Sequence, residues 1–125
     1  VCVDEFTICI SGVGKVYSFG RHVNCAHGHD DYSVFPPRII PSLFNIKSVC
    51  CSGNHTICLD YDGIVFTFGD NEFGQLGIGK DSEWLPYTHE PQKLHLPSIR
   101  QISCGFDFTI CLSEDSDLYS FGNNE

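Results

Sequence analysis

The chain has 125 residues, of which 42% are hydrophobic and 13% aromatic, and it carries a formal net charge of −9. Its 7 Lys and Arg residues form no cluster against 16 Asp and Glu residues, so we expect no nucleic-acid partner and no membrane partner. No run of 18 apolar residues is present, and the sequence therefore predicts no transmembrane helix. Helical periodicity is weak, and ten Phe without any Met favour a β-rich core.

Three hairpins are predicted along the chain, each with a strand, a short polar turn and a second strand. β-Branched and aromatic residues dominate the strands, as in residues 6–10 and 64–68. The middle turn ends in Asp62-Gly63, a dipeptide typical of tight hairpin turns. The sequence therefore predicts turns at 11–14, 60–63 and 113–116.

The three hairpins are copies of one repeat. In each copy a Thr is followed thirteen residues later by a Gly, with matched residue classes and no gap between them. The Thr residues are separated by 49 and 53 positions, and a period near fifty is typical of propellers and solenoids. The structural repeat positions are Thr7, Thr56 and Thr109, then Gly20, Gly69 and Gly122.

Two further strands are expected in each full repeat. One precedes the hairpin and has matched apolar positions, whereas the other is shorter and follows a proline-containing stretch that is interpreted as a variable loop. The preceding strands are predicted at 46–51 and 99–104, the shorter strands at 38–43 and 92–96, and the loops at 30–37 and 80–91.

Four short antiparallel strands per repeat are typical of a β-propeller blade. We therefore predict an all-β fold, a partial β-propeller of roughly two and a half four-stranded antiparallel blades. The whole chain, 1–125, is expected to be a single repeat array. Within it, 1–45 is a degenerate first repeat, 46–98 is the best-preserved repeat, and 99–125 begins a further repeat.

A glycine-rich loop follows the middle hairpin, where residues 69–79 hold four Gly. Such a density predicts positive φ angles or close backbone approaches, which makes Gly74 and Gly77 structural positions. The other residues of this loop are candidates for contact with a partner or a neighbouring blade: Asp70, Asn71, Glu72, Phe73 and Gln75.

The same loop matches a phosphate-binding pattern, G-x-x-x-x-G-K, over residues 74–80. The pattern requires Ser or Thr at the next position, where this chain has Asp81. Pro86 also interrupts any helix that would follow, although a helix N-terminus is what makes such a loop bind anions. A repeat turn is therefore favoured over a nucleotide site, and no cofactor is expected.

Possible metal ligands cluster where the first repeat has lost its glycine loop. Imidazole and thiolate groups bind zinc, but the spacing here offers no second ligand pair at a standard distance. A solvated loop that has drifted from the repeat pattern is the favoured interpretation. The weak metal candidates are His22, Cys25, His27 and His29.

Six of the eight Cys are periodic, so we interpret them as reduced core residues rather than a disulfide framework. Each periodic pair is seven residues apart on adjacent antiparallel strands, and bridging within such a pair stays open as an alternative. Cys25 and Cys50 have no periodic counterparts. The periodic positions are Cys2, Cys51 and Cys104, then Cys9, Cys58 and Cys111.

His55 by itself suggests a general base, and residues 54–56 match a glycosylation pattern. The equivalent residues in the other copies are Phe6 and Phe108, which do not titrate, so a packing position is favoured. No arrangement of nucleophile, base and acid is recognisable, and we predict no catalytic residue.

The best-preserved repeat resembles a family signature, that of the regulator of chromosome condensation family. The resemblance is carried by residues 51–59, 62–63, 66–69, 71 and 74–77. It weakens at 20–30, and the chain resembles a divergent member because three Phe stand where the family usually has Trp: Phe19, Phe68 and Phe121. Family members close seven such repeats into a ring, which implies that this chain is a fragment of a larger protein.

The resemblance implies a protein–protein interaction module that is non-catalytic in this segment. The alternative that it implies is a guanine-nucleotide exchange factor for a Ran-like small GTPase, which acts without covalent chemistry. Exchange residues lie on particular blades of the family's propeller, and we transfer none to this chain. Because no signal peptide is visible and the Cys are interpreted as reduced, an intracellular location, cytoplasmic or nuclear, is expected.

Overall fold

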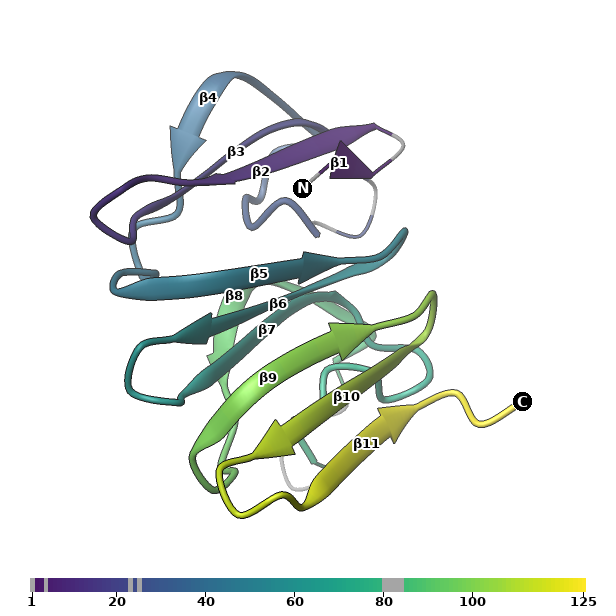
Figure 1. Ribbon diagram of the computed structural model, residues 1–125. Coiled ribbons are helices and arrows are strands. Elements are labelled where there is room, and N and C mark those ends of the chain that lie inside the picture. Colours follow the sequence, from purple (N-terminus) through teal and green to yellow (C-terminus); the bar gives the residue numbers. More distant parts are fainter. Residues whose placement is uncertain (1, 4, 23, 25, 80–84) are drawn as a thin grey trace.

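The computed structural model describes residues 2–3, 5–22, 24, 26–79 and 85–125, and all their regular structure is β-strand (Figure 1). The strands form three antiparallel sheets in which chain neighbours are also sheet neighbours. The first sheet holds β1 (Cys2–Val3), β2 (Phe6–Ile10), β3 (Val16–Arg21) and β4 (Ser33–Ile39). The second holds β5 (Ile46–Cys51), β6 (His55–Asp60), β7 (Val65–Asp70) and β8 (Tyr87–Lys93). The third holds β9 (Ile99–Cys104), β10 (Phe108–Ser113) and β11 (Leu118–Gly122).

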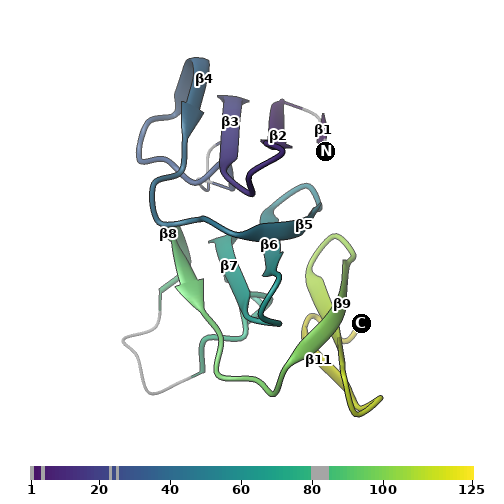
Figure 2. The same ribbon diagram turned by 60° about the vertical axis from the view of Figure 1, so that its left-hand side comes forward.

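The three sheets are stacked in chain order. Figure 2 shows β4 and β8, the last strands of the first two sheets, on the same side of the stack, and from each of them the chain continues into the first strand of the next sheet. Within the part of the chain that the structure describes, no helix is long and apolar enough to cross a membrane.

The repeat is visible in the strand register. Phe6 pairs with Gly20, His55 with Gly69, and Phe108 with Gly122. Each of the three Gly has a positive φ, 118°, 110° and 114° respectively, a conformation that L side chains rarely adopt. The thirteen-residue spacing in the sequence therefore corresponds to one hairpin register that recurs in all three sheets and ends at a Gly with positive φ.

The middle sheet supplies core residues on both of its faces. All six residues of β6 are buried, and because successive side chains of a strand point to opposite faces, Cys58 packs towards the first sheet and Ile57 and Leu59 towards the third. One cluster joins the first and second sheets, and Phe68 is its largest fully buried side chain. Burial of a side chain of this size contributes roughly 1.5–3 kcal/mol to stability.

The predicted positions of the fourth strands are wrong. The strands expected at 38–43 and 92–96 begin about five residues earlier, as β4 and β8, and include Pro residues of the ranges predicted as loops. Proline is tolerated here because an edge strand does not need every N–H for pairing. Two apolar residues of the predicted ranges, Ile40 and Leu94, follow β4 and β8 and are buried in the core.

Candidate functional site

The loop after β7 is held by buried polar side chains. Gln75 is fully buried, and its Nε2 donates a 2.8 Å hydrogen bond to Oδ2 of Asp70, which is 4% exposed. Its Oε1 accepts a bond from the backbone N–H of Phe73. Asn71, also buried, donates to the carbonyl of Leu85 and accepts from the N–H of Leu76. These three polar side chains therefore fold the loop and face its interior.

Burial also affects the charge of Asp70. It raises the pKa of this carboxyl, and the hydrogen bond from Gln75 opposes that rise by stabilising the carboxylate. The Gln75 amide thus supplies the hydrogen-bond donor that the buried Asp70 carboxyl requires.

The same loop exposes two of the candidate residues. Glu72 is exposed, and Phe73 retains 51% of its accessible surface. A cavity of about 490 Å³ opens beside Phe73, and its wall includes Asn71, Gly77 and Phe121. The loop therefore combines a rigid interior with an aromatic and an acidic side chain that a partner can reach.

The loop also joins neighbouring sheets. The buried hydroxyl of Thr109 on β10 donates a 2.8 Å bond to the carbonyl of Gln75. Nε2 of His55 lies 2.8 Å from the same hydroxyl oxygen. Because the hydroxyl hydrogen is directed to Gln75, His55 carries its proton on Nε2 and donates it to Thr109. Nδ1 of His55 lies 3.1 Å from the hydroxyl oxygen of Ser52.

An equivalent junction connects the first and second sheets. The Thr56 hydroxyl donates a 2.7 Å bond to the carbonyl of Ala26, in the loop that follows β3. His22 extends the same contact, since its Nε2 lies 2.6 Å from the carbonyl of Gly53. Two of the repeat Thr residues thus reach back to the preceding sheet, whereas Thr7 pairs with Phe19 inside the first sheet.

His55 should make stability fall in acid. Burial lowers its pKa to about 4, below the value of about 6.5 expected in an unfolded chain. The unfolded state then binds more protons below pH 6.5, so stability present at neutral pH is lost as pH falls from there towards 4, by about 2 kcal/mol at pH 5. Urea unfolding at pH 7 and pH 5 measures this loss.

The matched variant is His55→Phe, because Phe6 occupies the equivalent buried position in the first sheet. Burial also lowers the pKa values of His27 and His29, so a smaller acid sensitivity remains in the variant. Equal acid sensitivity in the variant and the parent would contradict this role of His55.

The histidine cluster after β3 is not a solvated loop, and that expectation is wrong. Residues 26–29 are buried, and His27 and His29 each keep one buried Nε2 without a hydrogen-bond partner among the described residues. His22 is engaged in the junction, and Cys25 lies outside the described residues. No group of three His, Cys, Asp or Glu residues is placed to hold a metal in the part of the chain that the structure describes.

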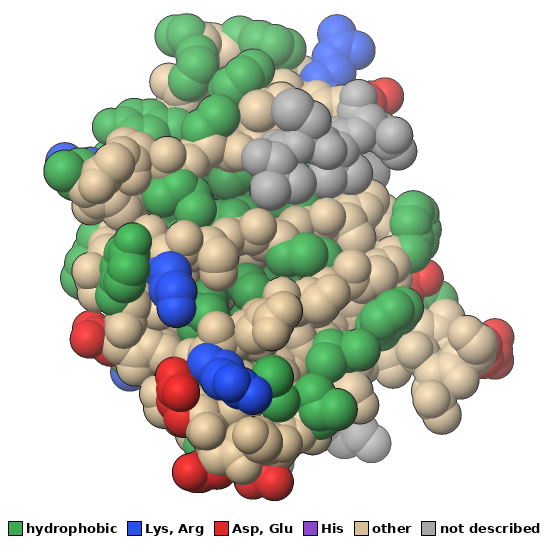
Figure 3. Space-filling model, in the orientation of Figure 1, with side chains coloured by type: hydrophobic (Ala, Val, Ile, Leu, Met, Phe, Trp, Pro, Cys, Tyr) green, Lys and Arg blue, Asp and Glu red, His purple; other side chains and the backbone are tan. Residues whose placement is uncertain are grey.

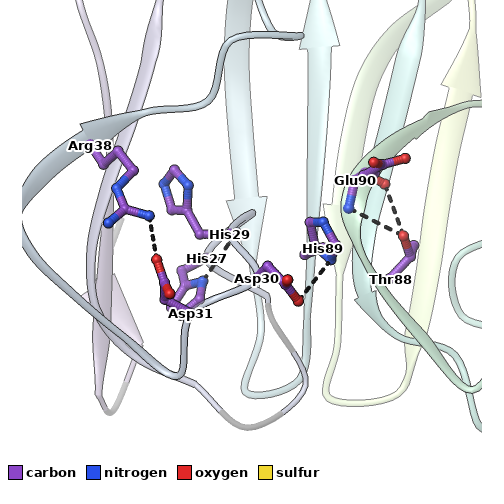
Figure 4. Close-up of polar contacts among 8 residues, drawn as sticks. All are labelled: His27, His29, Asp30, Asp31, Arg38, Thr88, His89 and Glu90. Atoms are coloured by element: carbon purple, nitrogen blue, oxygen red, sulfur yellow. Dashed lines mark hydrogen bonds and ion pairs between the residues drawn. The ribbon is translucent and has the colours of Figure 1, made fainter.

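A groove lies beside this cluster, between the outer strands of the first two sheets. Its volume is about 420 Å³, and residues 28–31, 38 and 89–91 contribute to its walls. Figure 4 shows Arg38 directed at Asp31 and His89 at Asp30. The N–O distances of these two contacts are 2.6 and 3.7 Å. The Arg38 guanidinium lowers the pKa of Asp31, and the contact of His89 with Asp30 joins the first and second sheets at this groove.

The phosphate-loop pattern does not form a described anion site. Lys80 and Asp81 lie outside the described residues. The N–H groups of Gly74 and Gly77 bond to carbonyls of the loop itself, those of Asn71 and Gly74, and the chain continues into β8. These glycines therefore stabilise successive turns of the loop.

The polar link at His55 is not predicted from the sequence. Because Phe6 and Phe108 are equivalent, the sequence predicts a packing position, and the side chain is indeed fully buried. The bond to Thr109 depends on a ring nitrogen that those equivalents lack. The sequence feature that would have indicated this link is a His at a repeat position that is otherwise Phe, next to the repeated Thr.

Stacked antiparallel sheets, each with its strands in chain order and linked from its last strand to the first strand of the next sheet, define a β-propeller-type repeat protein. The Regulator of chromosome condensation (RCC1) repeat matches residues 13–59 and 62–112, and a second version of the same repeat matches 46–75. The chain belongs to this family, and the predicted family and fold class are confirmed.

Individual relatives agree with this assignment. Protein RCC2 of Homo sapiens is 36% identical over 119 residues, which cover 93% of this chain and 23% of RCC2. The serine/threonine-protein kinase Nek9 of Mus musculus is 32% identical over 133 residues, 99% of this chain and 13% of Nek9. The solved structure of Prp20p from Saccharomyces cerevisiae superposes with a TM-score of 0.83 and 28% identity, over 98% of this chain and 30% of Prp20p. The chain thus spans less than a third of each of these relatives.

Proposed function

We propose that this chain is a protein-binding segment of an RCC1-type propeller and that the loop after β7 contacts the partner. The observation that carries this proposal is that some side chains of the loop are buried and others are exposed. Asp70, Asn71 and Gln75 are buried and hold its shape, whereas Glu72 and Phe73 are exposed. Rigid presentation of an aromatic side chain lowers the entropic cost of binding, and aromatic residues are enriched among binding hot spots.

Charge favours a partner with a basic surface. The chain has a net charge of −9, Figure 3 shows few Lys and Arg side chains on the face drawn, and the loop itself exposes the acidic side chain of Glu72. Prp20p, the solved relative, was studied for its binding to Gsp1p and histones. Both are proteins, and histones are strongly basic, so they are suitable probes for this proposal.

Replacement of Phe73 by Ala should weaken binding of the full-length protein to histones or to a Gsp1p-type GTPase by about tenfold or more. The expected loss follows from removing an exposed aromatic side chain that a partner would cover. Surface-immobilised partner and a concentration series of each variant give the dissociation constants.

The matched control is Tyr61→Ala. Tyr61 is also an exposed aromatic residue, 68% accessible, but it lies in the β6–β7 turn at the opposite end of the same sheet. Its replacement should leave the dissociation constant within about twofold. An equal loss of affinity for Phe73→Ala and Tyr61→Ala would contradict the proposed contact. So would a parent protein that binds neither histones nor the GTPase.

Guanine-nucleotide exchange is the second candidate function, favoured by the binding studies of Prp20p with Gsp1p. Exchange requires only that a bound loop distort the nucleotide site, so it needs no nucleophile, base or acid in this chain. Addition of the full-length protein to a GTPase loaded with fluorescent nucleotide separates the two functions. Binding without faster nucleotide release supports the interaction module, whereas accelerated release supports exchange.

We also propose an intracellular location, in cytoplasm or nucleus. Its support is that five Cys residues within the described part of the chain are free thiols, Cys9, Cys50, Cys58, Cys104 and Cys111, which is typical of reducing compartments.

A further inference from the structure

Two cysteines from neighbouring blades lie in contact, one on the first strand of the second sheet and the other on the first strand of the third sheet. Cys50 on β5 and Cys104 on β9 are 54 residues apart in the chain, and their Sγ atoms are 2.7 Å apart. Both side chains are partly buried. Because a disulfide has an S–S length of about 2.05 Å, a sulfur displacement of less than an ångström separates this contact from a covalent bond.

The periodic cysteine pairs of the second and third sheets lack this geometry. In the β5–β6 register Cys51 faces Thr56 and Cys58 faces Val49, so Cys51 and Cys58 are diagonal neighbours. Diagonal positions of an antiparallel pair are roughly 7–8 Å apart, which exceeds the usual Cα separation of a disulfide. Cys104 and Cys111 are related in the same way by the β9–β10 register. Cys50 and Cys104 thus form a close contact between sheets that the registers within the second and third sheets do not provide.

We propose that Cys50 and Cys104 are an oxidative modification site, which a small-molecule disulfide such as oxidised glutathione converts into a covalent link between two adjacent blades. The contact is preformed in the fold, and the link would join β5 to β9 without requiring either strand to leave its sheet. It would restrain the second and third sheets at the strands where the chain enters each of them.

The reaction proceeds by thiol–disulfide exchange. Cys50 as thiolate attacks one sulfur of oxidised glutathione, forms a mixed disulfide and releases one glutathione thiolate. Cys104, after losing its proton, attacks the Cys50 sulfur and releases the second glutathione. The two protein thiols lose two electrons and two protons, and one molecule of oxidised glutathione becomes two molecules of reduced glutathione.

The pair is arranged for Cys50 to react first. A hydrogen bond from the Cys104 thiol lowers the pKa of Cys50, and the same partnership raises the pKa of Cys104. Buried thiols elsewhere behave differently, because burial raises the pKa values of Cys58 and Cys111 and so disfavours their thiolates. An attacking thiolate next to a resolving thiol is the arrangement that turns a mixed disulfide into an internal one.

The test is disulfide mapping of the folded full-length protein in buffers with increasing ratios of oxidised to reduced glutathione. After acid quenching and alkylation, digestion without reductant should yield a peptide pair linked through Cys50 and Cys104 and lacking two hydrogens. Its fraction should rise with the ratio and exceed that of any other link among the described cysteines. Free, separately alkylated Cys50 and Cys104 at the most oxidising ratio would overturn the proposal, as would a persistent glutathione adduct on Cys50.

Variants sharpen the assignment. Cys50→Ser and Cys104→Ser should each abolish the linked peptide, and Cys50 should keep its glutathione adduct when Cys104 is replaced. Cys51→Ser is the matched control, because it changes the neighbouring residue of the same strand and should leave the linked fraction unchanged. Mapping of the unmodified protein decides the proposal even where a variant fails to fold, and denaturation in urea before oxidation should remove the preference for this pair.

Discussion

Replacement of Gly69 by Ala is expected to lower the free energy of unfolding by about 3 kcal/mol or more. Gly69 has φ of 110°, and a Cβ built there would lie 2.6 Å from the carbonyl oxygen of Asn54 and 2.8 Å from Cα of His55. Both are backbone atoms of the β5–β6 connection and the start of β6, so the clash cannot be relieved by a side-chain rotation. Relief requires separating two paired strands. Urea unfolding of the full-length protein measures the loss.

The control is Gly74→Ala. Gly74 also has a positive φ, 77°, but no atom lies within 4 Å of the position of its added Cβ. This variant should lose only about 1 kcal/mol of unfolding free energy, because its only cost is the backbone strain of an Ala in the left-handed region. Similar losses for Gly69→Ala and Gly74→Ala would show that φ alone matters, which would contradict the close backbone approach at Gly69.

Replacement of Thr109 by Val is expected to cost about 3 kcal/mol of unfolding free energy. The two side chains have nearly the same shape, so the substitution removes the hydroxyl with little change in volume. Without it, the carbonyl of Gln75 and the Nε2–H of His55 lose a partner inside the core. An unpaired buried polar group costs roughly 1–3 kcal/mol, and two of them are created together. Urea midpoints at an unchanged m-value report the effect.

Thr88→Val is the matched control for this prediction. The Thr88 hydroxyl also forms a hydrogen bond, but to Glu90 of the same strand at the surface, where water replaces the lost partner. The expected change is within about 0.5 kcal/mol. An equally small effect at Thr109 would mean that the junction between the sheets does not depend on its hydroxyl.

The hairpins could be predicted from the sequence because their information is local. The spacing from Thr56 to Gly69 sets a register within one pair of strands, and the Asp62-Gly63 turn fixes the length of the connection. The same spacing recurs from Thr7 to Gly20 and made the repeat, the family and the fold class accessible without a structure.

The outer strands and the junction could not be predicted in the same way. Pro91 argued for a loop because proline disfavours central strands, yet β8 is an edge strand where that rule does not apply. The loop around Ala26 lost its glycine signature, but its backbone carbonyl still accepts the Thr56 hydroxyl, and a carbonyl is invisible in a sequence. The contact of Cys50 with Cys104 joins residues that hold different repeat positions, so no periodic comparison pairs them.

The candidate site was predicted in outline only. The five loop residues were proposed together as contacts to a partner or a blade, and the structure separates buried Gln75 and Asp70 from exposed Phe73 and Glu72. Polar residues in a glycine-rich loop look alike in sequence. Only the folded loop distinguishes those that form its interior from those that remain accessible.

Hydrogen–deuterium exchange of the full-length protein, alone and saturated with histones or the GTPase, tests the proposed interaction most directly. We expect the partner to slow exchange at residues 71–74 and to leave the opposite turn, residues 61–64, unchanged. Protection of 61–64 without protection of 71–74 would contradict the account, because it would place the partner at the other end of the blade.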